Sequence, residues 1–436
     1  MSFLDKPLVN FHKHEDCQIT SDQVESIKIL DRMKERAKNE SLSVNLIYEN
    51  ETLRLKESGK SVSEISRIMP PLDEIKCTLY RSRWTRYPHL PKHLSEIVFA
   101  TGTNTERFMN TFDQTNERFL LVDCIENGQR IIIFASDLQL RLLCNSRQIG
   151  VDGTFKSCPG LFAQFYIIMG WCKGECMPVA FALLGGKMET TYRRMILELV
   201  NACRNMGLEF KPPRIIIDFE QGAFSAFKFF FKDSHILGCF FHFGQCLFRK
   251  LVELGLKKAY GEDEALQKWF NWCVSLVFIP LRHIETVFAD KILDEAPFEK
   301  YPLLNDFTDY MLETWIENGA LFPPDLLNQY SNLDEKSNNN NEGYNHRFNV
   351  RVGTASHPNI WKFLESTQKE EFLLVQVRCE GLKAGTLKSL GPKKRDLQRS
   401  LQISNAKIKY LASLKSYDDL IVLLEDCTCS VQNFLE

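Results

Sequence analysis

Two aspartates in this chain each end a short apolar run that is typical of a buried β-strand. Asp152 closes the segment IGVD, and Asp218 closes the segment IIID. If the two strands are neighbours in one sheet, both carboxylates meet at one edge, where open α/β sheets commonly bind ligands. Paired carboxylates suit Mg²⁺ or Mn²⁺, and two such ions can activate water and stabilise the leaving oxygen of a phosphodiester. The alternative is that these acids only cap strands or pair with Lys156 and Arg214.

A third carboxylate would complete such a metal site, and Glu342 is the best candidate. It follows the polar run SNNNN at 337–341, which is either a loop tip or the entry to a helix, because Asn is a favoured cap residue. In a helix that starts here, His346 lies one turn after Glu342 on the same side, and Asn345 could donate a hydrogen bond to the site. We therefore expect two Mg²⁺ or Mn²⁺ ions to be held by Asp152, Asp218 and Glu342.

Cys239 and His242 form a Cys-x-x-His pair at the end of the last predicted strand. A structural zinc ion needs four ligands. Cys246 adds a third, but no second spaced pair follows it. The spacing therefore argues against zinc and favours a structural role, with Cys239 in the core and His242 hydrogen-bonded near the site. His242 could also contact DNA or orient a carboxylate.

Two basic stretches could contact nucleic acid. The stretch 76–87 contains no acid and interleaves aromatic residues with arginines, so both phosphate contact and base stacking are available. Its DNA-contact candidates are Lys76, Arg81, Arg83, Trp84 and Arg86. The alternative is an amphipathic helix whose charges face solvent. A second patch includes Lys393, Lys394 and Arg395, and we expect it to be a mobile arm on DNA or a nuclear-import signal.

The elements that must position these residues follow from the spacing of apolar residues. It predicts helices between residues 21 and 86, and strands at 119–123 and 130–135 joined by the turn ENGQ. Further strands are predicted at 148–155, 162–171, 177–184, 214–218 and 235–241, with helices at 137–144, 190–206, 221–231 and 244–256. From residue 148 the order of these elements matches an RNase H-like α/β layout with a mixed five-stranded sheet.

The same reasoning divides the chain into six parts. Residues 1–20 are expected to be a disordered tail, and residues 21–114 a helical region that could bind DNA. Residues 115–259 would form the first part of the RNase H-like core, 260–335 a helical insertion, and 336–380 the last core helices with the third acid. Residues 381–436 are basic and then helical.

Composition narrows the class of protein. The chain has 436 residues and a formal net charge of -2, so any DNA contact would need local basic patches. Its 14 cysteines lack framework spacing and indicate reduced intracellular thiols. No secretory signal is visible, and no apolar run approaches the roughly 20 residues of a membrane span. We expect an intracellular protein with no membrane partner.

Four motifs occur in order along the chain: VDGTFK from Val151, IDFE from Ile217, GCFFHFGQ from Gly238 and NNEGY from Asn340. Together they resemble the transposase domain of Mutator-like elements (MULE), in the animal branch associated with FLYWCH zinc fingers. The resemblance covers most of residues 115–375. It implies a DDE triad at Asp152, Asp218 and Glu342, with a helical insertion between the second Asp and the Glu.

The resemblance also marks Cys239 and His242 as the Cys-x-x-His motif of several DDE superfamilies. The chain departs from the family pattern at Asn345, where many members have His, and His346 falls one place later. This departure leaves the expected metal ligand intact and puts in doubt any second role for the histidine.

What the resemblance implies is a DDE-type transposase, or a domesticated derivative, that cleaves and joins double-stranded DNA in the nucleus and could form a homo-oligomer. Residues 1–20 hold His12, His14 and Cys17 but no complete FLYWCH finger, which points to a truncated or domesticated copy. The alternative is a catalytically inactive DNA-binding or regulatory protein that keeps the fold. A host nuclease of RNase H type would share the metal site, but the insertion and the Cys–His pair argue against it.

Overall fold

The computed structural model describes most of the chain. Its described residues are 19–40, 42–112, 115, 117–172, 174–332, 339–353, 357–389, 391, 394–428 and 431, without the side chains of 339–342, 395 and 396. Contacts divide the chain into two compact units, Met1–Leu90 and Pro91–Glu436. Residues 1–18 of the expected disordered tail lie outside the described residues, whereas Thr20 caps the first helix.

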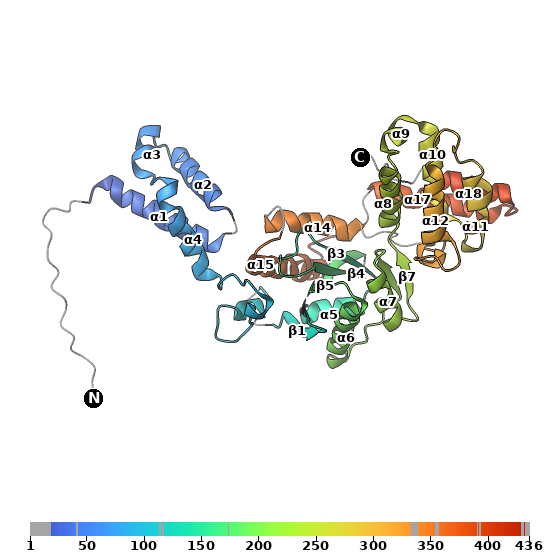
Figure 1. The fold of residues 1–436 in the computed structure, drawn as a ribbon. Helices are drawn as coiled ribbons and strands as arrows, with labels where there is room; N and C mark the ends of the chain where they lie inside the picture. Colours follow the sequence, from blue (N-terminus) through green and yellow to red (C-terminus); the bar gives the residue numbers. More distant parts are fainter. Residues whose placement is uncertain are drawn as a thin grey trace. The chain divides into compact units, whose positions relative to one another are not determined.

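Helices make up the described part of the first unit (Figure 1). They are α1 (Ser21–Asn39), α2 (Val44–Glu57), α3 (Val62–Ile68) and α4 (Leu72–Arg86). Reciprocal capping starts two of them, because Thr20 and Ser61 each exchange hydrogen bonds with the residue three positions later. Their apolar faces form a small core of their own, which includes Ile29, Met33 and Leu79.

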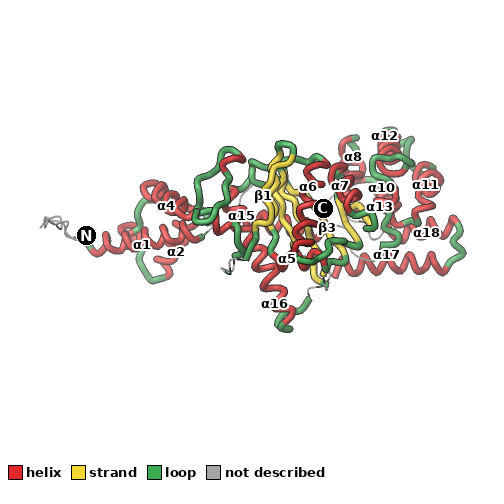
Figure 2. Tube along the Cα trace, turned by 90° about the horizontal axis from the view of Figure 1, so that it is seen from below, coloured by secondary structure: helices red, strands yellow, loops and turns green. Residues whose placement is uncertain are grey.

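A seven-stranded sheet is the centre of the second unit (Figures 1 and 2). Its strands are β1 (Leu120–Glu126), β2 (Gln129–Phe134), β3 (Gln148–Thr154), β4 (Gln164–Cys172), β5 (Glu175–Leu184), β6 (Arg214–Ile217) and β7 (His235–Gly238), in the spatial order β1-β2-β5-β4-β3-β6-β7. Strands β3, β4 and β5 form an antiparallel meander, and β6 and β7 run parallel to β3.

The sheet is larger than the five strands expected from the sequence. The hairpin β1–β2 was predicted, and its tight turn is present, with Asn127 and Gly128 at φ values of 48° and 77°. However, β2 pairs antiparallel with β5 and so extends the same sheet. The physical reason is burial, since Ile131 and Ile133 are fully buried in the core beneath the sheet.

Helices cover both faces of this sheet (Figure 1). On one face lie α5 (Asp137–Cys144), α6 (Glu189–Asn205) and α7 (Gln221–Phe230). On the other face α14 (Asn339–Val352) contacts β3 and β4 and packs against α15 (Ile360–Glu371). α15 continues through a π-helical turn, Phe372–Gln376, into α16 (Val377–Lys383). All residues of β4 except the last are buried. Because successive side chains point to opposite faces of the sheet and helices cover both faces, the strand is apolar almost throughout.

A helical region follows β7. It contains α8 (Phe240–Glu253), α9 (Lys257–Glu262), α10 (Glu264–Ser275), α11 (Ile284–Val287), α12 (Leu304–Met311) and α13 (Pro324–Leu327). π-helical turns at Phe288–Leu293 and Leu312–Ile316 extend α11 and α12. Its buried aromatic and aliphatic residues belong to the same apolar cluster as the sheet core.

The basic C-terminal segment was expected to be a mobile arm, and this expectation is wrong for its described residues. Instead, α17 (Lys394–Ala412) and α18 (Tyr417–Thr428) pack on each other, and α18 packs on α10. Ile403 and Tyr410 of α17 are buried in the main core. The buried Lys407 donates from Nζ to the main-chain oxygen of Gln329 over 2.9 Å. No described helix combines the length and apolar character that a membrane crossing requires.

Candidate functional site

Asp152 and Asp218 lie at the same level on two neighbouring parallel strands. In the pairing of β3 with β6, Ile149 is opposite Ile215 and Gly150 is opposite Ile216. Continuing this register by two residues sets Asp152 opposite Asp218, which directly follows β6. Paired residues in a sheet point to the same face, and neighbouring strands are about 4.8 Å apart. Continued in this way, the register sets two residues that are far apart in the sequence at the same edge of the sheet.

The same row extends to the next strand. In the pairing of β6 with β7, Ile217 is opposite Gly238, so Asp218 is followed across the sheet by Cys239. The main-chain N–H of Cys239 donates to the oxygen of Ile217 over 2.8 Å, which ties the end of β7 to the residue before Asp218. One row across three strands thus holds Asp152, Asp218 and Cys239, with Asp218 in the middle.

A side chain of the helix α14 holds Asp152 in place. Its side chain is 6% exposed, and Asn345 donates from Nδ2 to its Oδ2 over 2.7 Å. The following Gly153 is needed for packing, because a Cβ there would lie 2.3 Å from the side-chain oxygen of Gln164 on β4. The space beside Gly153 is therefore occupied by the side chain of Gln164 on the neighbouring strand β4.

Aromatic packing and a buried ion pair fix α14 on the sheet. Phe348 is fully buried, with its ring centroid 5.2 Å from that of Phe165 on β4 and 5.5 Å from that of Phe363 on α15. The buried carboxylate of Glu370 on α15 forms ion pairs with Arg347 and Arg351 of α14. A buried acid with two cationic partners is strongly position-specific, because losing either partner leaves charge uncompensated.

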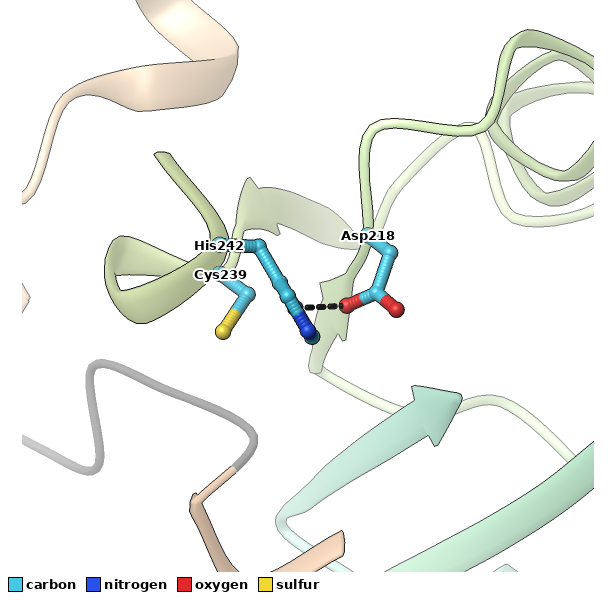
Figure 3. Close-up of side chains that lie close together, drawn as sticks. All are labelled: Asp218, Cys239 and His242. Atoms are coloured by element: carbon cyan, nitrogen blue, oxygen red, sulfur yellow. Dashed lines mark ion pairs between the residues drawn. The ribbon is translucent and has the colours of Figure 1, made fainter. Parts of the chain in front are cut away.

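Asp218 meets a different pair of side chains, Cys239 and His242 (Figure 3). His242 lies on the first turn of α8, and its Nδ1 is 2.5 Å from Oδ1 of Asp218. One ligand atom from each of Asp218, Cys239 and His242 falls within 4.8 Å of the others. Cys239 is fully buried, whereas the side chains of His242 and Asp218 are 20% and 26% exposed. The cluster is thus open to solvent on one side.

The helical region after β7 positions this corner. Phe219, next to Asp218, packs its ring on Gly238, where a Cβ would lie 2.5 Å from the ring. The buried Trp315 meets Phe219 edge to face, with ring centroids 4.7 Å apart. Gln329 donates from Nε2 to the oxygen of Gly238 over 3.0 Å. Phe219 and Gly238, which adjoin Asp218 and Cys239 in the sequence, are therefore held by residues of the helical region.

Negative charge is concentrated around Asp218. Burial raises the pKa of Glu220, and the carboxylate of Asp218 adds to the rise, while Tyr192 and Lys187 oppose it. Burial also raises the pKa of Tyr166 well above its usual value, with contributions from Tyr192 and then from Asp218, Glu220 and Asp152. Glu220 was not singled out in the sequence, although the motif IDFE contains it. Burial is thus the main cause of both shifts, and the neighbouring carboxylates add to them.

The third expected acid, Glu342, lies in α14, and its side chain is outside the described residues. Its main chain is one turn before Asn345, the residue that contacts Asp152. The third expected acid thus belongs to the helix that packs on β3 and contacts Asp152. Carboxylate oxygens at adjacent strand ends are a donor set that fits Mg²⁺ or Mn²⁺.

His346 is exposed on α14. It borders a shallow depression of about 280 Å³ together with Lys156, Asn349, Val350 and Gly353. Lys156 follows β3 and accepts at its main-chain oxygen a hydrogen bond from His357 over 3.0 Å. The depression thus has a cationic side chain and an imidazole in its lining.

The basic candidates of α4 separate into two groups. Arg83 donates to the main-chain oxygens of Ala37 and Leu42, and Arg86 to those of Lys38 and Asn39, so both tie α4 to the end of α1. Arg81 and Trp84 are exposed, and Lys76 is partly exposed. In the second patch, Lys394 is the exposed first residue of α17, while Lys393 and the side chain of Arg395 lie outside the described residues.

Comparison with protein-family models gives one match. Residues 148–245 match the MULE transposase domain, a segment that begins with β3 and ends in α8 and contains Asp152, Asp218, Cys239 and His242. Glu342 and the helical region after α8 fall outside it. No curated protein matches the chain. The carboxylate row and the Cys–His pair thus occur within a segment that is similar to a MULE transposase domain.

Proposed function

We propose that this chain is a DDE-type transposase, or a domesticated derivative of one, that performs divalent-metal-dependent cleavage and transfer of DNA strands. The proposal places Asp152, Asp218 and Glu342 as the metal ligands and the chain in the nucleus, where its DNA substrate is found. Within the MULE family we assign it to the animal FLYWCH-associated branch, on the four motifs from VDGTFK to NNEGY. A homo-oligomer would allow two DNA ends to be joined.

The observation that carries the proposal is the parallel pairing of β3 with β6, whose register, continued to the strand ends, sets Asp152 opposite Asp218. The strand order β5-β4-β3-β6-β7, with an antiparallel meander followed by parallel strands, supports an RNase H-like core within the larger sheet. The match of residues 148–245 to the MULE transposase domain supports the same assignment independently of the geometry.

Two Mg²⁺ or Mn²⁺ ions, when bound, would activate the attacking hydroxyl and stabilise the leaving oxygen of the phosphodiester. The chain contributes the position of the ligands. Asn345 orients the carboxylate of Asp152 by its hydrogen bond, and His242 lies against that of Asp218. Lys156 and His346 line one surface depression and are candidates to contact a DNA phosphate.

The test is a strand-cleavage and strand-transfer assay on plasmid DNA with Mg²⁺ or Mn²⁺. Asp152→Asn, Asp218→Asn and Glu342→Gln should each lower the rate ~10³-fold or more, because several kcal/mol of metal-based transition-state stabilisation is lost. Asp325→Asn, at an exposed acid on α13, is the matched control and should keep the wild-type rate. Activity that is independent of metal and equal in all variants would contradict the proposal.

A second candidate function is a catalytically inactive regulatory protein that binds double-stranded DNA. One observation favours it, since Asp152 and Asp218 each already have a polar partner, Asn345 and His242, without any metal. Such a protein would bind DNA equally well as wild type and as Asp152→Asn, with no cleavage in either case. Arg81→Ala and Trp84→Ala would then weaken DNA binding while leaving the fold of the first unit intact, because both side chains are exposed.

A further inference from the structure

We propose that Asp218, Cys239 and His242 form a site for a zinc-like divalent ion, distinct in chemistry from the Mg²⁺ or Mn²⁺ site and sharing Asp218 with it. One ligand atom from each residue lies within 4.8 Å of the other two. The inference does not depend on the proposed function, because it rests on a donor set and its geometry. It departs from the expectation drawn from spacing alone, which had no means of seeing that Asp218 supplies the third ligand.

The donor types select the class of metal. The cluster offers one thiol sulfur, one imidazole nitrogen and one carboxylate oxygen. Sulfur and imidazole are ligands for zinc and related transition metals, whereas Mg²⁺ requires oxygen. A catalytic-type zinc site commonly has three protein ligands and keeps the fourth position for water or substrate. The partial exposure of His242 and Asp218 provides the open side for that position.

The main chain preorganises the three ligands. Cys239 occupies the N-cap of α8, and His242 lies three residues later in the first turn, so both are fixed by the start of one helix. The register of β6 with β7 sets Asp218 opposite Cys239, and the hydrogen bond from Cys239 to Ile217 locks that level. Figure 3 shows the imidazole ring of His242 between the Cys239 sulfur and the Asp218 carboxylate.

Only small side-chain movements separate this arrangement from coordination. Ligand atoms around a tetrahedral zinc ion lie roughly 3–4 Å apart. The contact of 2.5 Å between His242 and Asp218 would have to open slightly, while Cys239 would close in. The ion would thus replace the His242–Asp218 ion pair with two metal bonds.

The shared residue has a consequence for regulation. Asp218 stands in the middle of the row, with Asp152 on one side and Cys239 on the other. A zinc ion bound by Cys239 and His242 draws the Asp218 carboxylate toward α8. This consequence rests on the proposed function: zinc should inhibit Mg²⁺-dependent activity by competing for this single carboxylate.

The test is titration of the full-length chain with Co²⁺, whose thiolate charge-transfer band reports sulfur ligation, followed by competition with Zn²⁺. Cys239→Ser should abolish the band. His242→Gln and Asp218→Asn should weaken binding by more than the roughly 10–100-fold that loss of an outer-shell partner costs. Cys77→Ser is the matched control, because Cys77 is an exposed thiol of the first unit.

Asp152→Asn separates the two proposals, since it removes a ligand of the Mg²⁺ site only and should leave the Co²⁺ band unchanged. A band that survives Cys239→Ser, or that disappears with Cys77→Ser, would overturn the zinc-site proposal. If Cys239→Ser fails to fold, X-ray absorption of the zinc-loaded wild-type chain decides the question. It should show one sulfur among nitrogen and oxygen neighbours, and a shell with no sulfur or with several would refute the ligand set.

Discussion

The two sides of Asp218 are built in different ways. On the β3 side, Asp152 is held by Asn345, which is 193 residues away in the sequence, and depends on the docking of α14. On the β7 side, Cys239 and His242 come from the strand–helix corner that follows Asp218, within the segment that matches the MULE domain. The first side is assembled from distant parts of the chain, and the second is nearly complete in one local unit.

This difference separates the two groups of supporting residues. The β7 side is held by Trp315 and Gln329 of the helical region, whereas the β3 side is held by Phe348 and Glu370. Damage to one support should therefore disturb one half of the site more than the other. The two sides should respond independently, because the effects of substitutions on stability usually add when the sites are far apart.

The largest effect is expected from Trp315→Ala. Trp315 is 1% exposed and packs on Phe219 and Phe243, so its truncation should lower the free energy of unfolding by about 4 kcal/mol. Urea unfolding measures the loss, and hydrogen exchange should rise in residues 214–247 more than in α14. Trp84→Ala removes the same side chain from an exposed position and is the control. An equal rise in hydrogen exchange in residues 214–247 and in α14 would show that the two sides of Asp218 are not supported independently.

Phe348→Ala should have the complementary effect. The ring is fully buried between Phe165 and Phe363, and its loss should lower the free energy of unfolding by about 3 kcal/mol. Exchange should then rise in α14, while Co²⁺ binding at Cys239 keeps its wild-type affinity. Val350→Ala, at a side chain that is 69% exposed on the same helix, should change stability by less than about 0.5 kcal/mol.

Asn345→Ala tests the contact that holds Asp152 on the β3 side. It removes the donor to the buried carboxylate of Asp152, and a hydrogen bond to a charged group contributes about 1.5 kcal/mol. The expected outcome is a comparable loss of stability in urea unfolding, with a lower strand-cleavage rate. Asn349→Ala, one turn later on α14, serves as the control. If Asn345→Ala leaves both the stability and the strand-cleavage rate unchanged, α14 packs over Asp152 without orienting its carboxylate.

The smallest expected effect is on the pH dependence of stability, through Asp263 in the helical region. The side chains of Lys300 and Tyr301 hold the pKa of Asp263 well below its usual value, with further support from the main-chain N–H groups of Ala265 and Leu266. A lowered folded-state pKa gives stability that is present above the unfolded value of about 3.9 and is lost as the pH falls below it.

Asp263→Asn should therefore reduce the loss of stability between roughly pH 6 and roughly pH 3. Urea midpoints at the two pH values measure it, and exchange in α10 should report the change before exchange in β3 does. An unchanged pH dependence would show that Asp263 does not couple to folding.

The sequence was sufficient for the strands and most helices because their signals are local. Apolar runs that end in Asp152 and Asp218, the Asn-Gly turn at 127–128, and the reciprocal cap at Ser61 each depend on a few neighbouring residues. The size of the sheet was not predictable in this way. Whether β2 joins β5 depends on which buried faces meet, and no short pattern encodes that pairing.

The candidate site shows the same limit. Asp152, Asp218, Cys239 and His242 were found from motifs, but the grouping of Asp218 with the Cys–His pair depends on the register of β6 with β7. Likewise, Arg83 looked like a phosphate ligand until its main-chain acceptors were visible. Burial of α17 through Ile403 and Tyr410 was missed because its basic residues dominate the local composition.

The position of β2 beside β5 bears on how this protein could be cut into smaller pieces. A fragment limited to residues 148–245 would retain three of the four motifs but lose β2, leaving β5 as an unprotected edge. The ring of Phe165 would lose its cover from Phe348 and Phe363 at the same time. Such a fragment should aggregate through its exposed strand, so the smallest soluble piece must begin before the hairpin and extend past α15.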